Sequence, residues 1–129
     1  MNFEDNALYK IKKCLENIKI KEDVVLIHSS LIPFKIKPYE IKYFCDFLVE
    51  KIGIDKTIIM PTFTFTFGLK KIWHYNSSKS ETGVLTEYFR KNFSECRTIH
   101  PIHSVSIYNN KYGLKHECKS SFGQKSVWE

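Results

Sequence analysis

Glycine and arginine are scarce in this sequence. Its 129 residues include five glycines and two arginines, Arg90 and Arg97. Five glycines at these positions form neither a Walker A loop nor a dinucleotide-binding fingerprint, so those two nucleotide sites are excluded. No run of eighteen or more apolar residues occurs, which predicts that no helix spans a membrane. Residues 1–10, MNFEDNALYK, carry acids where a secretory signal needs a basic start and an apolar middle, so we expect a cytoplasmic protein.

Motifs of a nucleophilic hydrolase or of a disulfide framework are also missing. No G-x-S-x-G elbow occurs, and the residues around Cys96 match no cysteine-hydrolase signature. The other cysteines, Cys14, Cys45 and Cys118, are widely separated from it and from one another. In a reducing cytoplasm this distribution predicts free thiols and no disulfide framework.

The formal net charge is +6 at pH 7, but the basic residues form no block. Lysines are spread from Lys10 to Lys125. A solvated lysine surface accounts for this distribution, and a site for an anionic cofactor is the next interpretation. The aromatic–basic interleaving of an RNA-recognition motif is absent, so we expect no nucleic-acid partner. A basic binding module without enzymatic activity remains an alternative hypothesis.

Apolar residues recur first at helical and then at strand spacing along the first half of the chain. Spacings of three and four predict an amphipathic helix over residues 3–19, and the apolar run 24–28 predicts a strand buried on both faces. A second helix is predicted to begin near Pro38 and to stop at Gly53. A second buried strand follows over residues 57–63. This order predicts two parallel strands joined by a right-handed crossover.

The second half of the chain contains shorter elements. A polar and aromatic loop is expected over residues 65–81, a helix over 82–92, and a strand with one solvated face over 104–108. We find no internal repeat or linker, so the chain reads as a single domain over residues 1–129. The expected fold class is α/β, a layered α/β/α domain with a central, mostly parallel sheet.

Hydroxyl side chains follow both strands of the predicted parallel pair. Ser29 and Ser30 come directly after the first strand, while Thr62 and Thr64 lie at the end of the second. Ligands of open α/β sheets bind outside the carboxyl ends of the strands. We therefore expect these two hydroxyl-rich loops to meet at one rim of the sheet and to bind a ligand there.

Histidine and cysteine side chains gather in and after residues 96–103. Zinc accepts these residue types, and the candidate ligands are Cys96, His100, His103, His116 and Cys118. Their spacing matches no common zinc pattern, so we expect no metal. His103 is the best local candidate for a catalytic base, because histidine titrates near neutral pH. The other interpretation is that the His100–His103 turn builds the wall of a cleft.

Five segments, in this order and spacing, resemble the aminoglycoside 3-N-acetyltransferase family. They are 26-LIHSSL-31, 59-IMPTFTF-65, 82-TGVLTEYFR-90, 97-RTIHPIHSV-105 and 122-FGQKS-126. The resemblance covers only about the first half of a family member. It therefore implies an α/β/α domain that is incomplete on its C-terminal side.

The resemblance implies acetyl transfer from acetyl-CoA, as co-substrate, to an amino group of an aminoglycoside or related amino sugar, with no metal. The implied cofactor-binding residues are Ser29, Ser30, Leu31, Thr62, Thr64 and Arg97. His100 and Ser104 are implied to line the substrate cleft, and Thr98 stands where the family usually has serine. The family's best-supported catalytic histidine lies in the second half, and no residue of this chain corresponds to it, so His103 is kept as the candidate base.

The alternative hypothesis is a non-catalytic, truncated remnant. A parallel sheet that stops in the middle leaves an open edge and an apolar face. We therefore expect either a homo-oligomer or a separate second-half polypeptide as partner, besides the small-molecule amine, and no membrane. Aminoglycosides are polycations, whereas the chain is basic with only 14 acidic residues. Either the acidic wall belongs to the second half, or the acceptor is a less cationic amino sugar.

Overall fold

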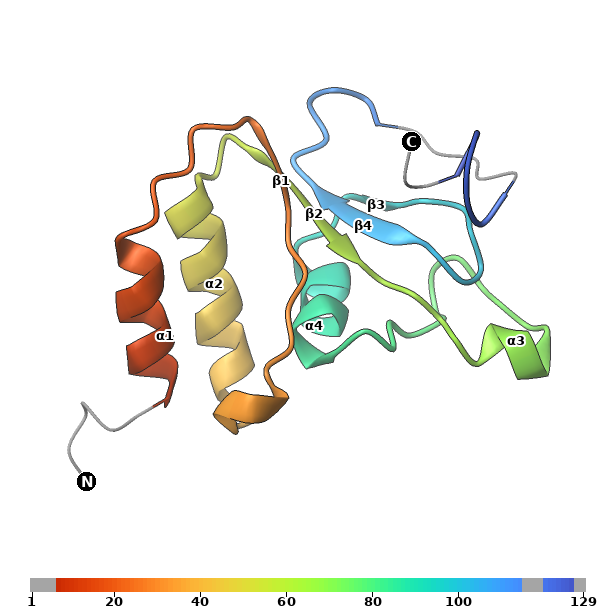
Figure 1. Ribbon diagram of the computed structural model, residues 1–129. Helices are drawn as coiled ribbons and strands as arrows, with labels where there is room; N and C mark the ends of the chain where they lie inside the picture. The colour runs from red at the N-terminus through yellow and green to blue at the C-terminus, as the bar shows by residue number, and fades with distance from the viewer. Residues whose placement is uncertain (1–6, 115–119, 127–129) are drawn as a thin grey trace.

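The computed structural model describes residues 7–114 and 120–126, in which helices and strands build one mixed α/β unit (Figure 1). The elements in chain order are α1 (Ala7–Glu16), β1 (Val24–Leu26), the 3₁₀ turn η2 (Ile32–Phe34), α2 (Glu40–Ile52), β2 (Thr57–Pro61), α3 (Phe67–Lys70), α4 (Val84–Asn92), β3 (Cys96–Arg97) and β4 (Val105–Tyr108). The predicted first helix, residues 3–19, is present as α1 but ends at Glu16, three residues earlier than predicted, and residues 3–6 lie outside the described residues.

The four strands form one sheet in the order β1-β2-β4-β3. β1 and β2 are parallel, as predicted, and the crossover between them contains α2. β4 runs antiparallel to both β2 and β3. The expectation of a mostly parallel sheet is therefore wrong for the described residues. The connection over residues 98–104 accounts for the antiparallel pairing of β3 with β4, because it is shorter than the dozen or more residues that a parallel crossover needs.

The apolar stripe of α2 forms the centre of the hydrophobic core, as its helical spacing predicts. Its buried members are Ile41, Phe44, Cys45, Leu48, Val49 and Ile52, and they cluster with Leu85 and Phe89 of α4 and with Ile58 and Met60 of β2. Gly53 ends the helix at a φ of 122°, and its N–H donates to Val49 O at 3.0 Å. A side chain at that φ would be strained, which is why glycine terminates helices so often.

Helices cover one face of the sheet in the described part of the chain. Ile58 and Met60 point to the same face of β2 because strand side chains alternate, and both belong to the cluster formed with α2 and α4. α1 packs on the outside of α2 (Figure 1). The described residues thus form two layers, helix on sheet, and the second helical layer of an α/β/α sandwich is not among them.

β1 differs from its expected burial. The run 24–28 predicts a strand enclosed on both faces, yet Val24 is 42% and Leu26 is 49% exposed. Among the described residues, β1 is the edge of the sheet and pairs only with β2, so its other edge has no strand partner and these two side chains are only about half covered. Within the described part of the chain, every helix is too short or too polar to cross a bilayer.

Candidate functional site

The loops that follow β1 and β2 meet at one cavity, as the strand-end argument predicts. Beyond β1, the N–H of Ile27 still donates to Ile59 O at 2.9 Å, so the two chains stay side by side. Ser29 and Ser30 on one side, and Phe63 on the other, line an open cavity of about 550 Å³. The third wall comes from the residues that lead into α4, including Thr82.

A second cavity of about 370 Å³ adjoins the first and shares three of its residues, Ser29, Ser30 and Thr82. Leu31 and the start of α4 complete its lining. We call the two cavities together the rim cleft. Two of the expected cofactor contacts, Ser29 and Ser30, thus lie on its surface, and the expected contact Leu31 lies on the wall of its second part.

Thr82 is a residue of the rim cleft that sequence reasoning missed. Its hydroxyl donates to Pro61 O at 2.6 Å, which ties the entrance of α4 to the end of β2. It also lies 2.9 Å from the hydroxyls of Ser80 and Thr86, and these two are 2.8 Å apart. The sequence did contain a signal, because a threonine followed by Gly83 directly precedes the predicted helix.

Thr62 and Thr64 lie beneath the rim and not on its surface. Both are buried, at 0% and 5% exposure. The N–H of Thr62 donates to Ser104 O at 2.8 Å, and the hydroxyl of Thr64 donates to Lys79 O at 3.0 Å. The expected direct contact of their hydroxyls with a ligand does not match this placement, because the hydroxyls already bond to the loops around them.

Arg97 holds these buried loops together. Its Nε donates to Ser104 Oγ at 2.8 Å, its Nη1 to Ser78 O at 2.6 Å, and its Nη2 to Thr62 O and to Thr64 Oγ1. The side chain is 6% exposed, and no carboxylate among the described residues forms an ion pair with it. Burial lowers the pKa of Arg97 to about 10, which still leaves it charged at neutral pH. Arg97 therefore fixes the rim from below.

His100 and Ser104, expected to line the substrate cleft, are both buried. The Nδ1 atom of His100 accepts the backbone N–H groups of Ile102 at 3.1 Å and of His103 at 2.8 Å. Nδ1 must therefore be unprotonated, and the ring closes its own turn. Ser104 is 0% exposed and bonds to Arg97. Their geometry is that of supports for the turn.

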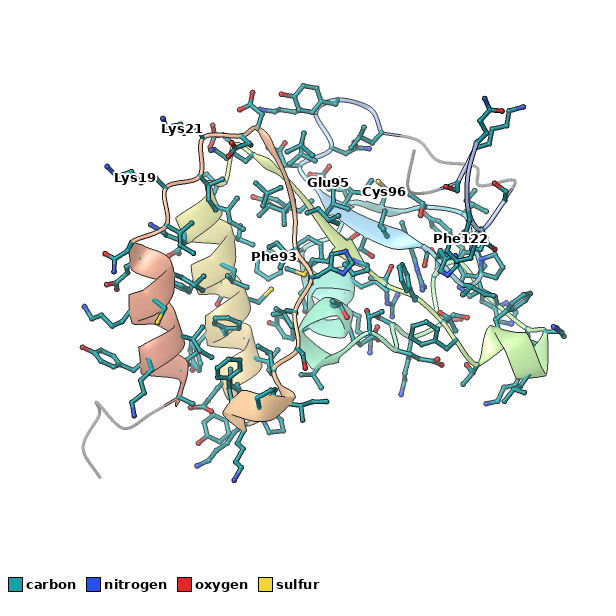
Figure 2. The ribbon with its side chains drawn as sticks, in the orientation of Figure 1. Lys19, Lys21, Phe93, Glu95, Cys96 and Phe122 are labelled. Carbon is teal, nitrogen blue, oxygen red and sulfur yellow. The ribbon has the colours of Figure 1, made fainter. Side chains whose placement is uncertain are left out.

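His103 lies against Phe63, a residue that lines the rim cleft. Its ring stacks on His100 with centroids 5.3 Å apart and meets the edge of Phe63 at 5.1 Å. The ring centroid of Phe122, which Figure 2 labels, lies 5.0 Å from that of His103. Because Phe63 lines the cleft, His103 can shape the cleft wall, and its expected role as a base stays a prediction.

The candidate zinc ligands do not converge where the structure describes them. Among residues 7–114 and 120–126, no group of three or more metal-ligating side chains occurs. His116 and Cys118 lie outside the described residues. Cys14, Cys45 and Cys96 are free thiols, and burial raises the pKa of Cys45 to about 12, so its thiol is protonated at neutral pH.

Comparisons with known proteins match the family that the sequence resembles. The family model for aminoglycoside 3-N-acetyltransferase matches residues 26–129. The fold is similar to YokD from Bacillus subtilis, with a TM-score of 0.67, 20% identity, and coverage of 93% of this chain and 56% of that one. Sisomicin-bound AAC-VIa gives a TM-score of 0.66, 16% identity, and coverage of 93% and 52%. The apoenzyme structure of AAC(3)-IVa gives a TM-score of 0.59 and 21% identity, and the match covers 81% of this chain and 40% of that one.

No curated protein sequence matches the chain. The chain spans about half the length of the solved structures that it resembles, and at these identities the likeness establishes the fold alone.

Proposed function

The chain belongs to the aminoglycoside 3-N-acetyltransferase family, and we propose that it forms the cofactor side of an enzyme that acetylates an amino group of an aminoglycoside or related amino sugar. The observation that carries this proposal is the rim cleft. Two strand ends and the start of α4 bring Ser29, Ser30 and Thr82 onto shared walls. Family membership supports an N-acetyltransferase role, and the rim cleft is the place that we propose for the acyl carrier.

Acetyl-CoA, the co-substrate that the family implies, would supply a thioester on a slender amide chain. Such a chain needs hydroxyl and backbone partners, and Ser29, Ser30 and the α4 entrance provide them. Gly83, the residue before α4, has open space where a Cβ would lie, so a ligand can approach its backbone closely. The residues present therefore fit this part of the carrier.

The reaction forms a C–N bond and breaks a C–S bond. The amine must attack as a neutral group, so a base must take its proton, and the carbonyl oxygen must be stabilised as it gains charge. The N-terminus of α4, which borders the rim cleft, carries a partial positive charge that favours such an oxyanion. Holding both reactants in one cleft lowers the barrier by about 7–11 kcal/mol.

The reaction also needs a catalytic base that takes the proton of the amine. We retain His103 as the candidate within this chain, acting from the cleft wall beside Phe63. Its ring does not line either part of the rim cleft as described. A base supplied by further sequence or by a second polypeptide fits the half-length of the chain relative to its solved relatives equally well.

We further propose that another polypeptide covers β1. Val24 and Leu26 expose apolar surface on an open sheet edge. A strand that pairs with this edge would form hydrogen bonds with the backbone of β1 and would bury these two side chains. A second-half polypeptide of the same fold is the occupant that the half-length match favours. A homo-oligomer and a remnant without activity are the alternatives.

The proposed function is tested by CoA release with acetyl-CoA and several amino-sugar acceptors. We expect release above background only when an amine acceptor is present. A thermal shift with acetyl-CoA tests binding separately, because a ligand that binds only the folded chain raises its melting temperature. A shift without turnover supports the cofactor-binding half of the proposal, while neither shift nor turnover contradicts it.

A further inference from the structure

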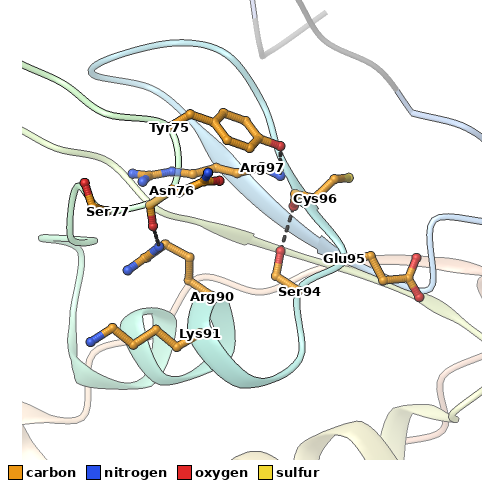
Figure 3. Close-up of a pocket in the computed structure, with 9 residues that line it drawn as sticks. All are labelled: Tyr75, Asn76, Ser77, Arg90, Lys91, Ser94, Glu95, Cys96 and Arg97. Carbon is orange, nitrogen blue, oxygen red and sulfur yellow. Dashed lines mark hydrogen bonds between the residues drawn. The ribbon is translucent and has the colours of Figure 1, made fainter.

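The only two arginines of the chain line one cavity outside the rim cleft (Figure 3). This cavity has a volume of about 470 Å³ and lies between the last turn of α4 and β3. Arg90 and Lys91 come from α4, and Arg97 comes from β3. Asn76, from the loop before α4, faces them across the opening (Figure 3). We call it the arginine cavity.

Arg90 is held in one orientation and still has donors to offer. Its Nε and Nη2 donate to Glu87 at 2.8 and 2.9 Å, and its Nη1 donates to Asn76 O at 2.9 Å. A guanidinium has five N–H groups in a rigid fork. These bonds occupy three of them, so two remain for a ligand.

Positive charge at the arginine cavity is only partly balanced. Glu87 serves both Arg90 and Lys91, whose Nζ lies 3.3 Å from Glu87 Oε1. Arg97 has no carboxylate partner among the described residues. After burial, repulsion from Arg90 is the next cause that lowers the pKa of Arg97, so the two guanidinium groups do interact unfavourably.

The one carboxylate that lines the arginine cavity does not offset this charge. Figure 3 shows the Glu95 carboxylate pointing away from both arginines, and it accepts the N–H of Asn110 at 3.0 Å. Tyr75 adds a neutral donor. Its hydroxyl accepts the N–H of Arg97 at 3.0 Å, which leaves the hydroxyl proton free to point at a ligand.

We propose that the arginine cavity binds a phosphate group. Phosphate oxygens accept several N–H and O–H bonds at once, and a fixed guanidinium fork matches their geometry. A bound dianion would also relieve the repulsion between Arg90 and Arg97. Two sources carry this chemistry: the nucleotide end of CoA, in which case the inference rests on the proposed function, and a free phosphorylated compound.

Helix stabilisation alone accounts for part of this arrangement. Cations in the last turn of a helix interact favourably with its dipole, and Arg90 and Lys91 occupy that turn. This explanation requires no further donor from Tyr75 and no second guanidinium from β3. It also predicts that added phosphate leaves the protein unchanged, which makes the two explanations separable.

Titration of the full chain with inorganic phosphate and with adenosine 3′,5′-bisphosphate, followed by calorimetry, tests the inference. Ser77 is exposed and lines the cavity, so Ser77→Asp adds a carboxylate there without disturbing the core. Lys91→Gln removes a charge from a side chain that is 55% exposed. We expect either change to weaken the affinity for both ligands by about tenfold, since a charge-assisted hydrogen bond to phosphate is stronger than a neutral one.

Lys19→Gln is the matched control, because it removes the same charge from the α1–β1 connection, far from Cys96 and Glu95 of the cavity (Figure 2). We expect its affinity for both ligands to equal that of the unmodified chain. Arg90→Gln should cause the largest loss, and it is interpreted only if its thermal unfolding remains cooperative. No measurable binding, or equal weakening by Lys19→Gln and Ser77→Asp, overturns the inference.

Comparison of CoA, dephospho-CoA and pantetheine distinguishes the two sources. If the cofactor is the source, Ser77→Asp weakens CoA by about tenfold and leaves pantetheine unchanged. A free phosphate compound is the source if Ser77→Asp weakens the binding of inorganic phosphate while CoA and pantetheine do not bind at all. In that case this inference holds and the proposed function is wrong. If pantetheine binds and Ser77→Asp leaves the affinity of every phosphate-containing ligand unchanged, the proposed function stands and this inference fails.

Discussion

Arg97 Nε donates to the hydroxyl of Ser104 at 2.8 Å, which joins β3 to the residue directly before β4. The same guanidinium reaches Thr62 O at the end of β2. One buried cation thus holds the residue after β2, which is distant in sequence, beside the connection between β3 and β4. Arg97 thus fixes the floor of the rim cleft and also lines the arginine cavity, and its expected role as a cofactor-binding residue stays a prediction.

Loss of Arg97 is predicted to destabilise the fold strongly. Arg97→Gln removes the guanidinium donors to Ser78 O and Thr64 Oγ1 and one of the two donors to Thr62 O, and each buried group left unsatisfied costs about 1–3 kcal/mol. We expect the free energy of unfolding in urea to fall by about 3 kcal/mol or more. Arg97→Lys should lose less, and the exposed control Lys19→Gln should stay within about 0.5 kcal/mol of the unmodified chain. A fall of the same size in Lys19→Gln contradicts the assignment.

Glu87 is predicted to make stability depend on acid pH. Burial alone would raise its pKa, but bonds from Arg90 and from the N–H of Ser80 outweigh burial and lower the pKa to about 2. Because the folded pKa lies below the ordinary value of 4.5, this stabilisation is present above pH 4.5 and is lost as pH falls toward 2.

Urea unfolding of the unmodified chain and of Glu87→Gln across that range measures the effect. The difference in unfolding free energy between the two proteins should shrink as pH decreases. If the difference in unfolding free energy stays constant with pH, these partners do not lower the pKa of Glu87.

His100 is predicted to act through Nδ1 as an acceptor and not through its charge. His100→Ala removes the acceptor of two N–H groups and should lower the free energy of unfolding by about 2 kcal/mol. His100→Asn offers a side-chain oxygen at a similar distance from the backbone and should recover part of that loss. Equal destabilisation by alanine and asparagine would mean that ring packing on His103 matters more than the accepted bonds.

Helical and local features could be predicted from the sequence, whereas long-range pairings could not. The stripe of α2 and the stop at Gly53 follow from spacing within one segment, and both are confirmed. The direction of β4 depends on which strand it meets, and the short connection over residues 98–104 was the one available sign of an antiparallel return.

The candidate site shows the same division. Ser29 and Ser30 follow a strand end and lie on the cleft, as a local rule predicts. Thr64 follows a strand end too, but Arg97, far along the chain, bonds to its hydroxyl and buries it. Spacing within one segment cannot reveal a bond of that kind.

The open edge at β1 is predicted to make the isolated chain self-associate. Leu26 is 49% exposed on an unpaired strand, so Leu26→Lys should reduce association by placing a charge on that edge. Ile54→Lys is the matched control, because Ile54 is 67% exposed but lies in the α2–β2 connection. Sedimentation velocity over a range of concentrations measures both. A monodisperse monomer for the unmodified chain contradicts the prediction.

Ser30 is predicted to affect cofactor binding without affecting stability. It is exposed and lines both parts of the rim cleft, so Ser30→Ala removes a hydroxyl from the cleft and leaves the core intact. We expect the thermal shift produced by acetyl-CoA to decrease, with an affinity loss of about fivefold, since a neutral hydrogen bond contributes about 1 kcal/mol.

Ser120→Ala is the control for Ser30→Ala, because Ser120 bonds to Gln124 O outside the cleft and its loss should leave the acetyl-CoA shift unchanged. Melting temperatures without ligand should agree between the unmodified chain and Ser30→Ala, which separates a binding effect from a folding effect. If Ser30→Ala binds acetyl-CoA as well as the unmodified chain does, the carrier lies elsewhere, and the strand-end argument for this cleft loses its support.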